Sequence, residues 1–141
     1  MGEIVIQSHA KSVKKEIMKN AKNALMIIGM KAEGYAKSLA PVDTGLLRNS
    51  ITFALGGEQT SVADYTDDSG SVVGSYNGVP PDDGGDRVTV YVGTNVHYAP
   101  YLELGHHTVS GDWVDARPFL RPSMEGHEDE YKKIIEKELL K

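Results

Sequence analysis

Imidazole and carboxylate side chains gather in one short stretch of the sequence, at His97, Glu103, His106 and His107. These are ligand types that zinc and similar ions accept. The stretch has no His-Glu-x-x-His pattern, however, and two adjacent histidines on an extended chain point to opposite sides. We therefore expect ordinary loop histidines without a metal. A small binding or regulatory module that holds a metal through these four residues is the alternative.

The segment 56–86 is a second candidate for ion binding, because it carries seven acidic residues and no basic one. A calcium loop needs carboxylates at defined alternating positions that end in a bidentate glutamate, and this segment lacks that pattern. Seven glycines and the run Val-Pro-Pro-Asp-Asp-Gly-Gly instead favour turns. We expect a flexible, acidic, glycine-rich loop or hairpin, with a short strand over residues 71–76.

The sequence contains no catalytic signature. A Ser-His-Asp order, a Gly-x-Ser-x-Gly elbow, a P-loop and a dinucleotide fingerprint are all absent. Glu103 and Asp43 could work as an acid–base pair only if folding joined them, and no spacing indicates that it does. The sequence therefore predicts that the chain is not an enzyme and needs no cofactor.

Three charges stand in segments that otherwise favour burial: Arg48, Glu103 and Arg117. Glu103 can pair with an arginine inside the subunit and hold a corner of the chain to a sheet, or it can act between subunits. A partly buried ion pair adds little net stability, but the loss of one partner is costly. We expect removal of Glu103 to affect folding or assembly more than removal of a surface acid.

The elements that must position these side chains begin with a long helix over residues 8–39, where apolar residues recur every three or four positions. A corner follows, in which proline stops the helix and glycine permits backbone angles that other residues resist. Its candidate residues for structure or contact are Pro41, Asp43, Thr44, Gly45, Leu47 and Arg48.

Two β-type runs, 50–55 and 87–93, flank the acidic segment, and residues 98–104 form a helical turn or an edge strand. A polar loop over residues 105–116 comes next. A second helix is expected from Arg121 onward, with acids near its start and lysines near its end. The fold class is α+β: a long N-terminal amphipathic helix, a small antiparallel β-sheet of three or four strands, and a C-terminal helix packed on the sheet.

Composition places limits on the class of protein. A chain of 141 residues is expected to form one domain over residues 1–141. No apolar run reaches the length of a membrane span, and the absence of cysteine fits a reducing cytoplasm. The net charge is −5, with +4 in residues 1–55, −7 in 56–86 and −2 in 87–141. We therefore expect no membrane partner and no sequence-specific nucleic acid, while a basic helix and an acidic segment suit self-association.

Three short blocks occur in order: Ala-Pro-Val-Asp-Thr-Gly-Leu-Leu-Arg-Asn-Ser-Ile from Ala40, Val-His-Tyr-Ala-Pro-Tyr-Leu-Glu-Leu-Gly from Val96, and Ala-Arg-Pro-Phe-Leu-Arg-Pro from Ala116. Together they resemble the HK97 gp10-like family of tailed-phage morphogenesis proteins. The resemblance implies a structural virion protein of a phage or prophage, acting at the head–tail neck or in tail completion. It also implies a homo-oligomeric ring that contacts other neck, head-completion or tail proteins and assembles in the host bacterial cytoplasm.

In this reading the later blocks also supply candidate structural or interface residues. Phe119, between two prolines, is expected to be a core anchor that fixes the start of the last helix, with a partner contact as the weaker alternative. The other candidates are Tyr98, Tyr101, Glu103, Gly105, Arg117 and Pro118. A non-viral, metal-binding module remains the alternative function.

Overall fold

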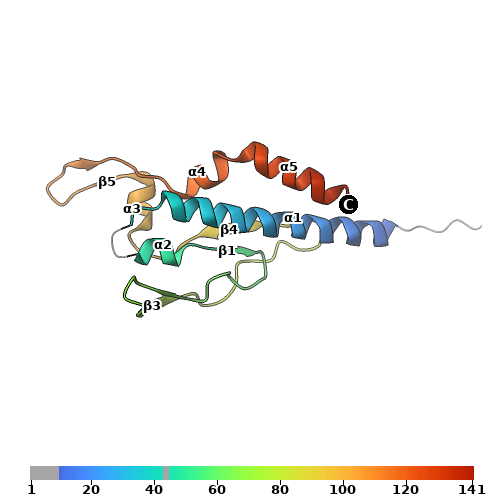
Figure 1. The fold of residues 1–141 in the computed structure, drawn as a ribbon, viewed down its shortest axis with the longest axis horizontal. Helices are drawn as coiled ribbons and strands as arrows, with labels where there is room; N and C mark the ends of the chain where they lie inside the picture. The colour runs from blue at the N-terminus through green and yellow to red at the C-terminus, as the bar shows by residue number, and fades with distance from the viewer. Residues whose placement is uncertain (1–9, 43–44) are drawn as a thin grey trace, which may run out of the picture.

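The computed structural model describes residues 10–42 and 45–141, and helix α1 (Ala10–Leu39) is its central element. Its 30 residues correspond to about 45 Å at the standard helical rise. Figure 1 shows the remaining elements arranged along this rod. Within the described residues, no helix combines the length and the apolar character needed to cross a lipid bilayer. The predicted long N-terminal helix is confirmed.

One side of α1 is covered by a strand pair formed by β1 (Thr52–Leu55) and β4 (Val90–Gly93). The two strands are antiparallel, with Phe53 opposite Val92 and Ala54 opposite Tyr91. Every residue of β1 is buried, because α1 lies on one face and the chain around residue 61 lies along its outer edge. The predicted runs 50–55 and 87–93 thus supply the two paired strands.

The other side of α1 is covered by α4 (Leu120–Glu125) and α5 (Glu128–Leu139), as Figure 1 shows in orange and red. At the seam the Tyr35 ring stacks on His127, with 3.6 Å between ring centroids. Tyr35 Oη donates to Glu130 at 2.7 Å, and Lys31 pairs with the same carboxylate at 3.0 Å. The C-terminal helix was expected to lie on the sheet; it packs against α1 instead, because its apolar face meets the apolar stripe of that helix.

The acidic segment folds into a second antiparallel pair, β2 (Asp64–Thr66) and β3 (Val72–Ser75). A third pair joins β5 (His106–His107) to β6 (Trp113–Val114) inside the stretch expected to be a polar loop. In the part of the chain that the structure describes, these are three separate two-stranded sheets. The α+β class and the antiparallel pairing are confirmed, whereas the strands do not join into the expected single sheet of three or four strands.

The interior consists of two apolar clusters that share α1. The first surrounds Phe119 at the C-terminal end of α1, and the second surrounds Tyr131 near its middle. Several buried positions on α1 are small: Ala24, Ala32 and Ala36 are fully buried, and Gly29 is buried as well. Small side chains let a strand pair and a helix approach α1 from two sides at once.

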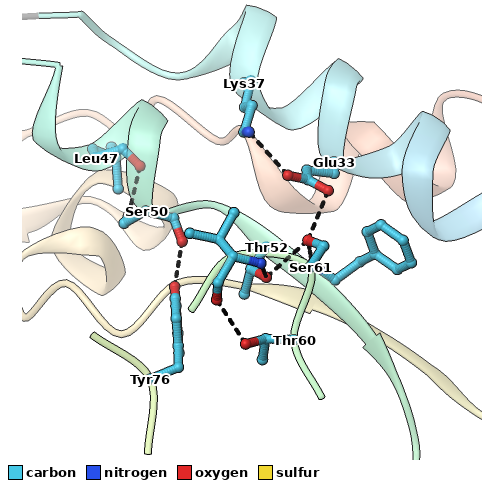
Figure 2. A network of polar contacts seen from close by, with 10 residues as sticks. Glu33, Lys37, Leu47, Ser50, Thr52, Thr60, Ser61 and Tyr76 are labelled. Atoms are coloured by element: carbon cyan, nitrogen blue, oxygen red, sulfur yellow. Dashed lines mark hydrogen bonds and ion pairs between the residues drawn. The ribbon is translucent and has the colours of Figure 1, made fainter. Parts of the chain in front are cut away.

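A chain of polar contacts ties α1 to β1 (Figure 2). Lys37 pairs with Glu33 at 2.9 Å, and Ser61 Oγ donates to the same carboxylate at 3.0 Å. Ser61 Oγ also lies 3.0 Å from the Thr52 hydroxyl. Thr52 is almost fully buried, so these bonds satisfy a polar group that the strand places next to the core.

Two glycines of α1 give a matched test of this packing. A Cβ at Gly29 would lie 2.9 Å from Phe53 Cγ, whereas a Cβ at Gly34 would meet open space. We expect Gly34→Ala to stabilise the protein by about 0.5–1 kcal/mol through helix propensity. Gly29→Ala should destabilise it by about 1–3 kcal/mol despite the same propensity gain, because Phe53 is buried in β1 and overpacking forces it to move.

Urea unfolding of the two variants beside the parent chain measures both changes. Equal stabilisation by the two substitutions would show that the strand does not press on α1 at Gly29.

Candidate functional site

The corner between α1 and β1 is built around a short helix, α2 (Leu46–Ser50). Pro41 follows the end of α1, and Gly45 takes a left-handed backbone with φ of 78° just before α2. Such angles strain any residue with a Cβ, and the Asp68 carboxylate fills the space where one would stand. Asp43 and Thr44, also predicted to shape this corner, lie outside the described residues.

Polar bonds centred on the buried Ser50 fix α2 to the ends of the neighbouring strands. Ser50 is fully buried; its hydroxyl donates to the Leu47 carbonyl at 2.6 Å and lies 2.6 Å from the Thr94 hydroxyl. Tyr76 Oη donates to the Ser50 carbonyl, which draws the acidic segment onto the same corner just after β3 (Figure 2). Burial raises the pKa of Tyr76, so the phenol stays a neutral donor. Leu47, predicted from the sequence, packs beneath this network at 2 % exposure.

The acidic hairpin β2–β3 is attached to the corner by two further contacts. Asn49 Nδ2 donates to the Thr66 carbonyl at 2.8 Å, and Arg48 lies 3.8 Å from the Asp68 carboxylate. Both charges are about half exposed, so the ion pair contributes little to stability. Arg48 is thus engaged with the acidic segment of its own chain.

Glu103 caps the start of another helix. It lies in α3 (Ala99–Leu104), and its carboxylate accepts the backbone N–H groups of Phe119, Leu120 and Arg121 at 2.9, 3.1 and 2.8 Å. These amides are the unpaired donors at the first turn of α4. An arginine partner inside the subunit was one expectation for Glu103. In the structure its carboxylate binds three backbone amides instead, because the end of α3 lies next to the start of α4.

The protonation of Glu103 follows from this geometry. Partial burial alone would raise the pKa of the Glu103 carboxyl, but the three N–H donors and the nearby Arg121 charge outweigh it. The pKa therefore lies below the ordinary glutamate value of 4.5. Glu103 is a carboxylate at neutral pH and holds α3 against α4 as a charged acceptor.

The three sequence blocks meet at Phe119. This ring is completely buried, and its cluster contains residues of the corner together with Val96 and Ala99 from the second block. Arg117 N–H donates to the Leu102 carbonyl at 2.6 Å just before the ring enters the core. Phe119 is thus placed as the expected core anchor.

The remaining candidates lie at the surface around the β5–β6 hairpin. Gly105 has φ of 77°, and a Cβ there would lie 2.6 Å from the Trp113 ring, so glycine lets the hairpin fold back onto α3. Tyr98 is partly buried against the Phe119 cluster. Tyr101, Arg117 and Pro118 are exposed beside the hairpin.

The four possible metal ligands are not brought together. Glu103 is used by the α4 amides, His106 packs its ring edge on Tyr101, and His107 packs against Trp113. His97 packs against Tyr98. Across residues 10–42 and 45–141, no three His, Asp or Glu side chains form a group that could hold a metal ion. The alternative of a metal site through these residues has no geometric support.

Sequence reasoning missed two parts of this region. Ser50, Tyr76 and Thr94 form a network around the buried Ser50, and no local pattern distinguishes them from surface hydroxyls because their partners lie far along the chain. The β5–β6 hairpin did carry a signal. Ser110-Gly111-Asp112 stands between β-forming residues, and Gly111 has the positive φ that such a turn requires.

The comparisons with known proteins give one match. The family model described as "Bacteriophage HK97-gp10, putative tail-component" matches residues 5–105. The match spans α1, the corner, the acidic segment and α3, and it ends before the hairpin and the C-terminal helices. No curated protein and no solved structure matches.

The helix cap predicts the outcome of substitutions at Glu103. Glu103→Ala should destabilise the protein by about 1–2 kcal/mol, since three first-turn amides lose their acceptor. Glu125→Ala is the control: among the described residues its exposed carboxylate pairs with the exposed Arg121 at 3.6 Å and with no other charge, so the expected change is below about 0.5 kcal/mol. Denaturant unfolding distinguishes the two, and equal losses would contradict a capping role.

The same carboxylate predicts a pH dependence. Because the folded pKa of Glu103 is lowered, its contribution is fully present above the ordinary value of 4.5 and is lost as pH falls through the folded pKa. The difference in free energy of unfolding between the parent chain and Glu103→Gln should therefore shrink below that pH. Unfolding curves recorded from neutral pH into the acid range measure it. A constant difference would mean that the carboxylate charge is not involved.

Proposed function

The chain belongs to the HK97 gp10-like family of phage proteins, and on this basis we propose that it is a structural subunit of the virion of a tailed phage or prophage. It works at the head–tail neck or in tail completion, as a homo-oligomeric ring that contacts other neck, head-completion or tail proteins. The observation that carries the proposal is the family match, which covers most of the chain and contains two of the three blocks that resemble this family.

The geometry around Phe119 supports a structural role. The described residues of the three blocks converge on a buried ring, a helix cap and a hydroxyl network. Such an arrangement holds the corner, α3 and the hairpin in fixed positions relative to α1. A ring subunit needs this rigidity, because a small angular error at each interface adds up around the ring.

The surface supports contacts with other subunits. Large apolar side chains are exposed at separate places: Val13 and Ile17 on the first turns of α1, Leu104, Val109 and Trp113 around the hairpin, and Leu140 at the end of the last helix. A closed ring needs two different, complementary surfaces on each subunit. The exposed apolar residues lie on elements at both ends of the elongated molecule (Figure 1). They are suited to form two such contact surfaces.

Removal of the gene from its phage or prophage tests the proposal. We expect DNA-filled heads and separate tails by electron microscopy, with infectivity restored when the parent chain is supplied from a plasmid. The protein should also appear in purified virions. Normal, infectious particles in the absence of the gene would contradict the proposed function.

Size-exclusion chromatography with light scattering, followed by negative-stain imaging, tests the ring. A discrete closed particle is the expected result, either alone or after addition of the purified neck or tail. A chain that stays monomeric alone and on both templates would contradict the ring.

A further inference from the structure

The β5–β6 hairpin projects from the body of the molecule beside α3 (Figure 1). It carries two exposed apolar side chains: Val109 at its tip is completely exposed, and Trp113 on β6 is 54 % exposed. Asp112 and Asp115 are the charged residues of segment 105–116, which contains no lysine or arginine. The hairpin is therefore a protruding element with two exposed apolar side chains and two negative charges.

A large hollow lies on the N-terminal half of α1, where residues 12–26 face Leu55 and the loop at Gly85. It has a volume of about 1080 Å³ and is open to solvent. Met18, Met26 and Leu55 supply an apolar lining, and Lys15, Lys19 and Lys22 supply positive charge. Methionine side chains adapt to the shape of an inserted group, which suits a docking groove.

The positive charge of this α1 groove is available to a partner. In the described part of the chain, Lys14 pairs with Asp86, whereas Lys15, Lys19 and Lys22 take part in no ion pair. From the sequence, the basic helix of one copy could bind the acidic segment of a neighbouring copy. The Lys14–Asp86 pair engages these two elements within one subunit.

The hairpin offers the complementary charge. Asp112 and Asp115 also take part in no ion pair among the described residues, and both are exposed. The two surfaces match in three properties: a protrusion matches a hollow, exposed Val109 and Trp113 match a methionine lining, and two aspartates match three lysines. Complementary potentials of this kind set the partner and the orientation of an interface.

We propose that the β5–β6 hairpin of one copy of this chain docks in the α1 groove of the next copy. The hairpin and the N-terminal half of α1, which carries the groove, lie toward opposite ends of the molecule (Figure 1), so each copy donates one and receives the other. Such a heterologous contact closes into a ring when its rotation divides a full turn. This inference rests on the proposed ring and assigns the two surfaces that form its seam.

A nucleic acid fits the groove less well than a second copy does. Glu16 and Glu58 line the same hollow as the lysines, and the acidic loop containing Asp82 and Asp83 lies beside it. These carboxylates repel a phosphate backbone, which needs a continuous basic surface. A protein element with only two carboxylates and with exposed apolar side chains matches both the lysines and the methionines.

Charge reversal tests the seam. The hairpin variant carries Asp112→Lys and Asp115→Lys, and the groove variant carries Lys15→Glu and Lys19→Glu. Each alone should associate at least about tenfold more weakly than the parent chain, because like charges then face each other. An equimolar mixture of the two variants should regain association. The control is Lys132→Glu with Lys133→Glu, which reverses two exposed lysines of α5 outside the groove and should assemble as the parent does.

Sedimentation velocity over a concentration series measures association, and circular dichroism checks that each variant is folded. Unchanged association of both charge variants, or a mixture that stays as weak as its components, overturns the proposal. A further experiment compares the binding of the hairpin variant and of the parent chain to a purified neck or tail. It tests whether the hairpin contacts another phage protein instead of a second copy of this chain. Loss of that binding with normal self-association would assign the hairpin to another phage protein and also overturn the proposal.

Cysteine cross-linking tests the contact directly, since the chain has no cysteine of its own. Val109→Cys in one copy and Met26→Cys in another should form a mixed disulfide on mild oxidation. Val72→Cys on β3, which is also exposed, is the matched control and should not. Equal cross-linking at the two positions, or none at protein concentrations of about 1 mM, where even weak complexes are populated, overturns the proposal.

The proposed function and the hairpin–groove seam can be contradicted by different results. Normal virions without the gene would remove the proposed function. Virions that need the gene but tolerate both charge variants, each folded and assembled, would remove only the hairpin–groove seam.

Discussion

The close approach of two layers to one helix is the constraint on which this structure depends. Helix α1 meets the β1–β4 pair on one side and α4–α5 on the other, and its contact positions are small: Ala24, Ala32 and Ala36 are fully buried and Gly29 lies under the Phe53 ring. Larger side chains would separate the layers and open cavities. A single helix can therefore organise two apolar clusters, and every other element takes its position from it.

Polar groups, rather than further apolar burial, fix the ends of this assembly. Ser50 and Ser123 are fully buried, and each donates to the carbonyl three residues earlier in its own chain. Tyr131 Oη donates to the Ser123 carbonyl at 2.6 Å, and burial raises the pKa of Tyr131 to about 12, so the donor is neutral throughout the physiological range. Within the described residues no buried side-chain polar atom is left without a partner. Such satisfied networks make the relative positions of the helices specific.

The residues that stabilise the fold differ from those on the surfaces proposed for assembly. The blocks that mark the family are used mainly inside the subunit: Phe119 fills the core, Glu103 caps α4 and the corner carries α2. The surfaces proposed for assembly lie elsewhere, on the hairpin and on the exposed half of α1. The internal blocks fix the positions of those surfaces, and the proposed ring would depend on these positions.

Local patterns were sufficient for the elements whose cause is local. The period of α1, the stop at Pro41, the strand character of 87–93 and the charge gradient of the last helix follow from side-chain type and spacing. The sequence predicted one helix from Arg121 onward and did not predict the break between α4 and α5 at Gly126. Glycine is needed there because a Cβ would lie 2.6 Å from the Pro122 carbonyl oxygen. That requirement arises from the path of the backbone and does not change the spacing of apolar residues in the sequence.

The sequence by itself determined the α+β class, the long first helix, the corner and the family, because each rests on short-range order. Only the tertiary structure decided which groups meet. It separated the strands into pairs, placed the C-terminal helix on α1, gave Glu103 to backbone amides rather than to an arginine, and drew Tyr76 onto Ser50. Contacts between residues far apart in the chain depend on how all the layers pack at once, and no local pattern contains that information.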